Sequence, residues 1–267
     1  MLVKKFIYLV VMLSLSPIVT GEAIEIDFVY VGDAKHSSLL GVKQGIDESN
    51  LQGQFLNQKY NLDIVASNEI DGYDFSKYIA VLTSLNASQL KKLAKQLTDM
   101  PIFNLVDESN ELRLNCISNI LHIAPSSKMK SDALEQLQIK KPNSNANPKS
   151  WHYSFVKFAA RDLNKRFKKN HKVNMDDDSW AGWAAVKMTS DTVARTQITN
   201  SKEMLGYLKN KLSFDGQKGS DMNFRVTGQL RQLILLVEND KIVAEAPIRG
   251  VAKPPTLDSL GSLECAN

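Results

Sequence analysis

Polar side chains follow four predicted strands in this chain of 267 residues, at the point where each strand ends. Hydroxyl, carboxylate and imidazole groups can hold a small polar solute by hydrogen bonds and ion pairs. In an open parallel sheet the carboxyl ends of the strands meet at one edge, which is where such folds bind ligands. The candidate ligand contacts are Asp33 and His36, Ser67 and Asn68, Thr83 and Ser84, and Asp107 and Glu108. The same residue types also cap helices and fill solvated turns, and that role stays open for each of them.

Other reactive residues lack the spacing of a catalytic or metal site. Asp176, Asp177 and Asp178 precede a helical segment, where carboxylates cap a helix more often than they bind a metal. The histidines are scattered, and no nucleophile elbow, phosphate loop or dinucleotide-binding glycine pattern is present. The basic run "RDLNKRFKKNHK" is typical of a solvated helix end, with a docking patch as the alternative. We therefore predict a protein that is not an enzyme and has no metal and no cofactor.

Composition and the N-terminus place the chain among exported globular proteins. The sequence is 43% hydrophobic and 23% charged, enough to bury a sizeable core. Lys4 and Lys5 precede an apolar run that ends in small residues, which predicts a secretory signal over residues 1–21 and a periplasmic protein, with an uncleaved anchor as the alternative. Removing these two lysines changes the formal net charge from +4 to +2, so nothing favours nucleic acid as a partner.

The chain contains two cysteines, Cys116 and Cys265. In an exported protein an even number favours a disulfide, and these two residues form the one possible intrachain pair. Two free thiols remain the alternative.

Alternating apolar patterns predict a parallel α/β arrangement over residues 22–139. Strands are expected at residues 24–30, 59–67, 77–84, 101–106 and 119–124, with helices at 37–49, 86–100 and 127–138. Strands that alternate with helices at this spacing form right-handed crossovers in one parallel sheet.

The composition changes at residues 140–150, "KKPNSNANPKS", which are predicted to form a linker that buries nothing. Residues 151–267 are expected to return to the same lobe. One predicted helix begins near Trp151 and buries Phe155, Phe158 and Leu163, and others cover residues 175–196 and 201–209. A final strand over residues 233–243 is expected to add to the edge of the sheet or to form a hairpin near it.

Several segments resemble a known family. "GVKQGIDESNLQGQFLNQKYNLDIV", "WAGWAAVKM" and "SFDGQKGSDMNFRVTGQLRQLILLV" are similar to type I periplasmic substrate-binding proteins of the leucine-binding kind. "IFNLVDESNELRLNCISNILHIAPSSKMKSDAL", "WHYSFVKFAARDLNKRF" and the tail "LDSLGSLEC" resemble the branch of ABC-transporter binding proteins associated with PQQ-dependent alcohol dehydrogenase systems. The resemblance covers most of the mature chain, rests on the combined order of its pieces, and also implies the Cys116–Cys265 pairing.

The resemblance implies a flavodoxin-like open parallel sheet, here reduced to essentially one lobe, because residues 140–150 stand where the family has a long second-lobe segment. Half a cleft buries only half of a ligand, so hinge-closing capture is not carried over directly. The implied function is a non-catalytic component of an ABC transporter or PQQ-dependent alcohol oxidation system, which binds a small molecule, a permease, or a quinoprotein dehydrogenase or cytochrome. The alternatives are a solute-binding protein that completes its cleft as a homodimer, and an uncharacterised periplasmic hydrolase.

Overall fold

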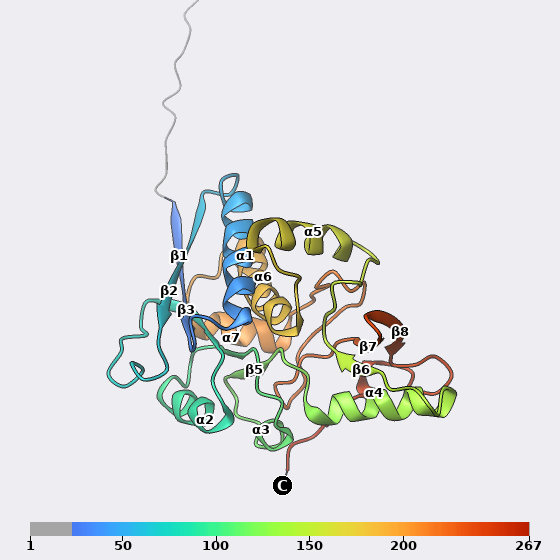
Figure 1. Ribbon diagram of the computed structural model, residues 1–267. Coiled ribbons are helices and arrows are strands. Elements are labelled where there is room, and N and C mark those ends of the chain that lie inside the picture. The colour runs from blue at the N-terminus through green and yellow to red at the C-terminus, as the bar shows by residue number, and fades with distance from the viewer. Residues whose placement is uncertain (1–22, 267) are drawn as a thin grey trace, which may run out of the picture.

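The computed structural model describes residues 23–266 and is built around a five-stranded parallel sheet (Figure 1). Its strands are β1 (Ile24–Val31), β2 (Gln58–Val65), β3 (Tyr78–Thr83), β4 (Ile102–Asn104) and β5 (Ile120–His122). They lie in the order β2-β1-β3-β4-β5, and every neighbouring pair is parallel. In this order the connections diverge between β1 and β3, which is the switch point where such sheets open a crevice. The predicted signal peptide lies outside the described residues.

Helices cover both faces of this sheet (Figure 1). They are α1 (Ser37–Gly53), α2 (Ala87–Gln96), α3 (Asn110–Leu114), α5 (Ala160–His171), α6 (Asp177–Thr196) and α7 (Ser201–Asn210). Alternate side chains of β1 pack into the cores on opposite faces of the sheet. Phe28 and Tyr30 pack in the core that contains α1, α5, α6 and α7, whereas Val29 and Val31 pack in the core that contains α2 and α3. Because helices cover both faces, every residue of β3, at the centre of the sheet, is buried, as is typical of parallel strands.

α1 and α6 lie in close contact and run in the same direction. A Cβ on Gly41 would lie 1.7 Å from the carbonyl oxygen of Ser179, and one on Gly182 would lie 2.2 Å from that of Ser38. Further along both helices, the hydroxyls of Ser49 and Ser190 are 2.8 Å apart. The glycines let the two backbones touch, so both helix N-termini, with their partial positive charge, lie at the carboxyl edge of the sheet.

A second, smaller sheet is antiparallel and consists of β6 (Asn147–Lys149), β7 (Ile234–Glu238) and β8 (Lys241–Ala246). α4 (Ser127–Lys140) covers it, and the two share an apolar cluster of their own. Of the two arrangements expected for residues 233–243, addition to the edge of the parallel sheet is wrong and a hairpin is present, because Asn239 and Asp240 have positive φ and turn the chain between β7 and β8. The expectation that residues 140–150 bury nothing is also wrong, since Ala146 is buried in this cluster.

The strands and helices predicted between residues 24 and 140 are present, but the helix expected from Trp151 begins only at Ala160. Phe158 has a φ of 52°, which is incompatible with a right-handed helix, and its side chain is 62% exposed where burial was predicted. Its ring lies over Gly219, where a Cβ would come within 2.1 Å of it. Phe155 and Leu163 are buried as predicted.

The disulfide between Cys116 and Cys265 is present, which confirms the predicted pairing. It joins the loop after α3 to the C-terminal segment, beyond the short 3₁₀ helix η1 (Leu257–Ser259). The amide of Ala266 also donates to the carbonyl of Leu114. The bridge closes a loop of 149 positions, so it removes much conformational freedom from the unfolded chain.

Candidate functional site

The candidate site lies at the carboxyl edge of the parallel sheet, where β1 and β3 end side by side. Gly32 follows β1 with a φ of 150°, and a Cβ there would lie 2.0 Å from Oγ of Ser84. The backbone N–H of Asp33 donates to the same Oγ over 3.3 Å. The glycine therefore brings the ends of the two strands together, and Ser84 lies at the switch point.

His36 begins α1 and connects it to α6. Its side chain caps the helix by accepting a hydrogen bond from the N–H of Ser38. The Oγ of Ser38 is 3.0 Å from Nδ1 of His36 and 2.8 Å from the hydroxyl of the buried Tyr30. Nε2 of His36 lies 3.7 Å from Oδ2 of Asp178, in the first turn of α6. An imidazole and a carboxylate thus face each other at the paired helix N-termini.

Asp178 is the most perturbed carboxyl group of this edge. Its side chain is 37% exposed and accepts no hydrogen bond from the described residues. Burial first, and then the neighbouring charges of Asp176, Asp177 and Glu108, raise the pKa of Asp178 to about 7 against a smaller opposite effect of Lys130. A carboxylate with so little compensation favours the approach of an ammonium group or of hydroxyl donors.

Glu108 and Lys130 form the side of the site nearest α4. The ammonium of Lys130 contacts a carboxylate oxygen of Glu108, and the carbonyl of Glu108 accepts hydrogen bonds from the N–H and the hydroxyl of Ser127. Asp107 is engaged differently, because its Oδ1 accepts from the N–H and hydroxyl of Ser109 and lies 3.6 Å from the buried Arg113.

The remaining predicted residues are not brought into this group by any described contact. Thr83 is fully buried, and its hydroxyl donates to the carbonyl of Phe103. Ser67 and Asn68 are exposed in the turn after β2, the edge strand next to β1. Among the eight predicted residues, those that the structure connects to one another or to Asp178 are Asp33, His36, Ser84 and Glu108. We call these four, together with Lys130 and Asp178, the carboxyl-edge cluster.

The three consecutive aspartates have three different roles. Asp176 caps α6, as the sequence predicted, by accepting from the N–H of Ser179. Asp177 accepts from the N–H of Trp151 and forms an ion pair with Lys149 at 3.0 Å. Asp178 turns to the carboxyl edge. A run of acids at a helix start gives no sign of this difference, since it depends on which distant segment packs beside each carboxylate. No group of three or more residues suited to a metal ion occurs among the described residues.

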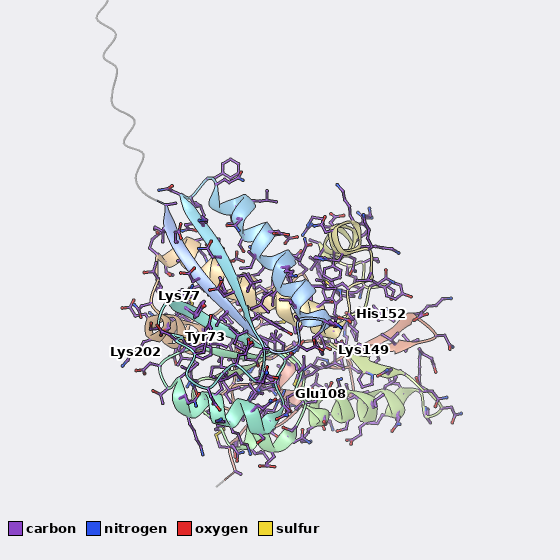
Figure 2. All side chains as sticks on the ribbon, turned by 60° about the vertical axis from the view of Figure 1, so that its left-hand side comes forward. Tyr73, Lys77, Glu108, Lys149, His152 and Lys202 are labelled. Carbon is purple, nitrogen blue, oxygen red and sulfur yellow. A yellow bond between two sulfur atoms is a disulfide. The ribbon has the colours of Figure 1, made fainter. Side chains whose placement is uncertain are left out.

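Figure 2 shows Lys149 and His152 on the same side of the molecule as Glu108, and Tyr73, Lys77 and Lys202 on the opposite side. Lys149 and His152 line a polar pocket of about 470 Å³ beside the β7–β8 turn. Nε2 of His152 lies 3.7 Å from a carboxylate oxygen of Asp240. Burial lowers the pKa of His152, so its imidazole is less readily charged than a free one. The other basic residue of this pocket, Lys149, is already paired with Asp177.

A pocket of about 530 Å³ lies elsewhere, between the C-terminal half of α6 and residues 213–217. Its charged lining residues are two cations and two anions, Lys187, Arg195, Asp191 and Asp215, and Lys187 already pairs with Asp191 at 2.8 Å. Because these charges compensate one another, the carboxyl-edge cluster remains the better candidate for binding a charged solute.

No family model matches the sequence, and no curated protein matches it. The fold is similar to that of solved ABC-transporter binding proteins. A branched-chain amino acid ABC transporter periplasmic ligand-binding protein from Burkholderia xenovorans LB400 has a TM-score of 0.69 and 11% identity, with 82% of this chain and 95% of that chain covered. The substrate-binding protein LivJ from Streptococcus pneumoniae, in complex with isoleucine, has a TM-score of 0.64 and 9% identity, with coverages of 84% and 98%.

A leucine-, isoleucine-, valine-, threonine- and alanine-binding protein from Brucella ovis, in a closed conformation, is similar at a TM-score of 0.67 and 10% identity, over 91% of this chain and 99% of that chain. The chain therefore has the α/β fold of type I periplasmic binding proteins, as the sequence resemblance implied. Among the described residues, no helix is long and apolar enough to cross a membrane.

Proposed function

We propose that the protein is a non-catalytic solute-binding protein of the periplasm, which binds a small solute carrying an amino or hydroxyl group at the carboxyl-edge cluster. The observation that carries this proposal is Asp178. It is a half-buried carboxylate at the switch point of a binding-protein fold, with an imidazole 3.7 Å away, and none of the residues that the structure describes donates a hydrogen bond to it. An amino or hydroxyl group of a solute would supply the missing donors, and the hydroxyl of Ser84 would hold a second polar group.

The small sheet would provide the opposite wall. α4 and β6–β8 have a separate apolar cluster, and the sheet that they form has three described strands. These observations support a second lobe that is strongly reduced, so that the solute is held on one side by the parallel sheet and only partly covered on the other. We propose that affinity is modest in the monomer. A homodimer that closes the cleft with a second chain is the alternative.

The partners follow from the same fold. An ABC permease is the partner that the similarity to transporter components supports. A quinoprotein dehydrogenase or cytochrome of a PQQ-dependent alcohol oxidation system is supported by the sequence resemblance alone. We propose the permease as the first partner to test and the dehydrogenase as the second, by asking which of them co-purifies with the tagged protein from its own host.

A thermal-shift screen tests solute binding. A ligand that binds only the native state adds about 2.7 kcal/mol to the free energy of unfolding at 100 times its dissociation constant. We expect small amino acids, amino alcohols or polyols to raise the melting temperature at pH 8, and Asp178→Asn to abolish the rise. If no solute in this set shifts the wild-type protein at 10 mM, solute capture is refuted and the partner role remains.

The same screen separates the two assembly states. Light scattering with and without the stabilising solute reports whether binding occurs in the monomer, as proposed, or only in a dimer. A shift that requires dimerisation would replace the one-sided site by the closed, two-chain cleft.

A further inference from the structure

A second surface of the molecule has the features of a docking groove for an extended chain. β8 is an edge strand of the small sheet, and no described strand pairs with its outer side. Beside it runs the segment Ser154–Lys157, and the two enclose a groove of about 450 Å³ that reaches from Ile242 to Glu245. The ion pair between Lys157 and Glu245, at 2.6 Å, joins the two walls. An open strand edge offers a row of backbone donors and acceptors to any chain that lies along it.

Apolar side chains stand exposed where this groove meets α5. Val156 is 58% exposed and lies between this groove and a neighbouring hollow of about 220 Å³, which Tyr153 also lines. Phe158, two residues on, is 62% exposed in spite of its unfavourable backbone conformation. A group of large exposed apolar side chains next to an unpaired strand is typical of an interaction surface rather than of solvated loop residues.

The rim of the hollow is positively charged. Arg161, Lys165 and Lys168 are spaced four and three residues apart, so they share one face of α5, and all three line the hollow. Lys165 and Lys168 form no ion pair with a described carboxylate, and Arg161 has only its neighbour Asp162, at 3.8 Å. This is part of the basic run for which the sequence left two roles open, a solvated helix end and a docking patch.

We infer that this surface, formed by β8, the segment Ser154–Lys157 and the cationic face of α5, docks an extended acidic segment of another protein. The segment would pair its backbone with β8, place an apolar side chain against Val156, and direct carboxylates toward Lys165 and Lys168. β8 has one residue, Val243, without an opposite residue on β7, and this bulge bends the strand. Backbone pairing is therefore expected along Ala244 and Glu245, where the register is regular and both residues line the groove.

The positive rim favours an acidic partner over a second copy of this chain. A two-fold contact presents the same surface from both chains, so it would bring the two basic rims toward each other. Like charges across an interface disfavour association, whereas an acidic segment neutralises the rim and is attracted from a distance. The inference does not depend on the carboxyl-edge cluster, and the residues tested below are not part of that cluster.

Peptide binding followed by NMR tests the inference with the full mature chain. The probe is an octapeptide of alternating valine and glutamate, and the comparison peptides are the same sequence with lysine for glutamate and the acidic sequence with alternate backbone nitrogens methylated. We expect shifts of the Ala244, Glu245 and Val156 amides with the acidic peptide, and at least tenfold weaker binding of both comparison peptides.

Charge variants complete the test. The double variant K165E/K168E is expected to bind the acidic peptide about tenfold more weakly, while the double variant K95E/K202E, with the same charge change on α2 and α7, binds it unchanged. Circular dichroism confirms that both variants are folded. Equal binding of the acidic and basic peptides would overturn the inference. So would self-association that protects β8 from hydrogen exchange, or binding to anionic phosphatidylglycerol vesicles in place of the peptide.

Discussion

The substitution Asp178→Asn probes the candidate site without a ligand. Burial and neighbouring acids raise the pKa of Asp178 from 3.8 to about 7. Because the folded pKa is higher than the unfolded one, the native state keeps a proton that the unfolded chain has lost between about pH 4 and pH 7. The stability contributed by this proton is therefore present at low pH and is lost as the pH rises through 7. Asn remains neutral at every pH and does not show this loss.

The size of the effect follows from the shift and the exposure. Three pKa units correspond to about 4 kcal/mol if the site were fully buried. The side chain is 37% exposed, so solvent screening reduces the penalty, and we take about 1.5 kcal/mol. Asn also loses the favourable interaction of a carboxylate with the N-terminus of α6, worth about 0.5 kcal/mol. We expect Asp178→Asn to raise the free energy of unfolding by about 1 kcal/mol at pH 8, with a smaller gain at pH 5.

Urea unfolding at pH 5, 6.5 and 8 measures this difference directly. Asp162→Asn is the matched control, because Asp162 also lies in the first turn of a helix but is exposed. This control should change stability by less than about 0.5 kcal/mol at all three pH values. A loss of stability for Asp178→Asn at pH 8, or a gain that does not depend on pH, would refute the electrostatic reasoning about the site.

Three further outcomes are expected. Cys265→Ser should lower the free energy of unfolding by about 2–5 kcal/mol in denaturant unfolding, with the far-UV spectrum kept. Non-reducing mass spectrometry should show Cys116 linked to Cys265 in the wild type, and free thiols there would contradict the structure. Gly41→Ala should lower the free energy of unfolding by about 1–3 kcal/mol, because its Cβ would overlap a carbonyl of α6. Gly206→Ala, in an open position of α7, should raise it by about 0.5–1 kcal/mol. Equal effects of the two substitutions in denaturant unfolding would contradict the close contact of α1 with α6. The affinity for an amine solute should increase from pH 6 to pH 8, as calorimetry can measure, because ionised Asp178 attracts an ammonium group; a flat pH profile would count against its role.

The first half of the fold was predictable because local pattern and tertiary structure agree there. β3 is an apolar run, β1 alternates apolar residues with Glu25 and Asp27, and the helix after β3 has a capping box at Asn86 that the sequence indicates. The errors lie where a backbone conformation rather than a pattern decides the structure. Phe158 adopts positive φ, so the helix expected from Trp151 starts late, and the same conformation at Asn239 and Asp240 selects the hairpin over the edge strand that was its alternative. Asn-Asp between apolar runs is a turn signal that indicates such a hairpin.

The candidate site was only half predictable from the sequence. Topology places Asp33 and Ser84 at the same edge, because both follow parallel strands that are neighbours in the sheet. It does not reveal Asp178 or Lys130. Asp178 reaches the cluster through the contact of α6 with α1, and Lys130 through the position of α4. The contact of the two helices depends on Gly41 and Gly182, which lie 182 − 41 = 141 positions apart, so no single segment shows their joint role.

A crystal structure of the protein with the solute that most raises its melting temperature tests the central claim most directly. We predict that the solute lies at the carboxyl edge of the parallel sheet, with an amino or hydroxyl group within hydrogen-bond distance of a carboxylate oxygen of Asp178 and with a second polar group at Oγ of Ser84. A solute bound in the pocket between α6 and residues 213–217, with the carboxyl-edge cluster filled only by water, would contradict it.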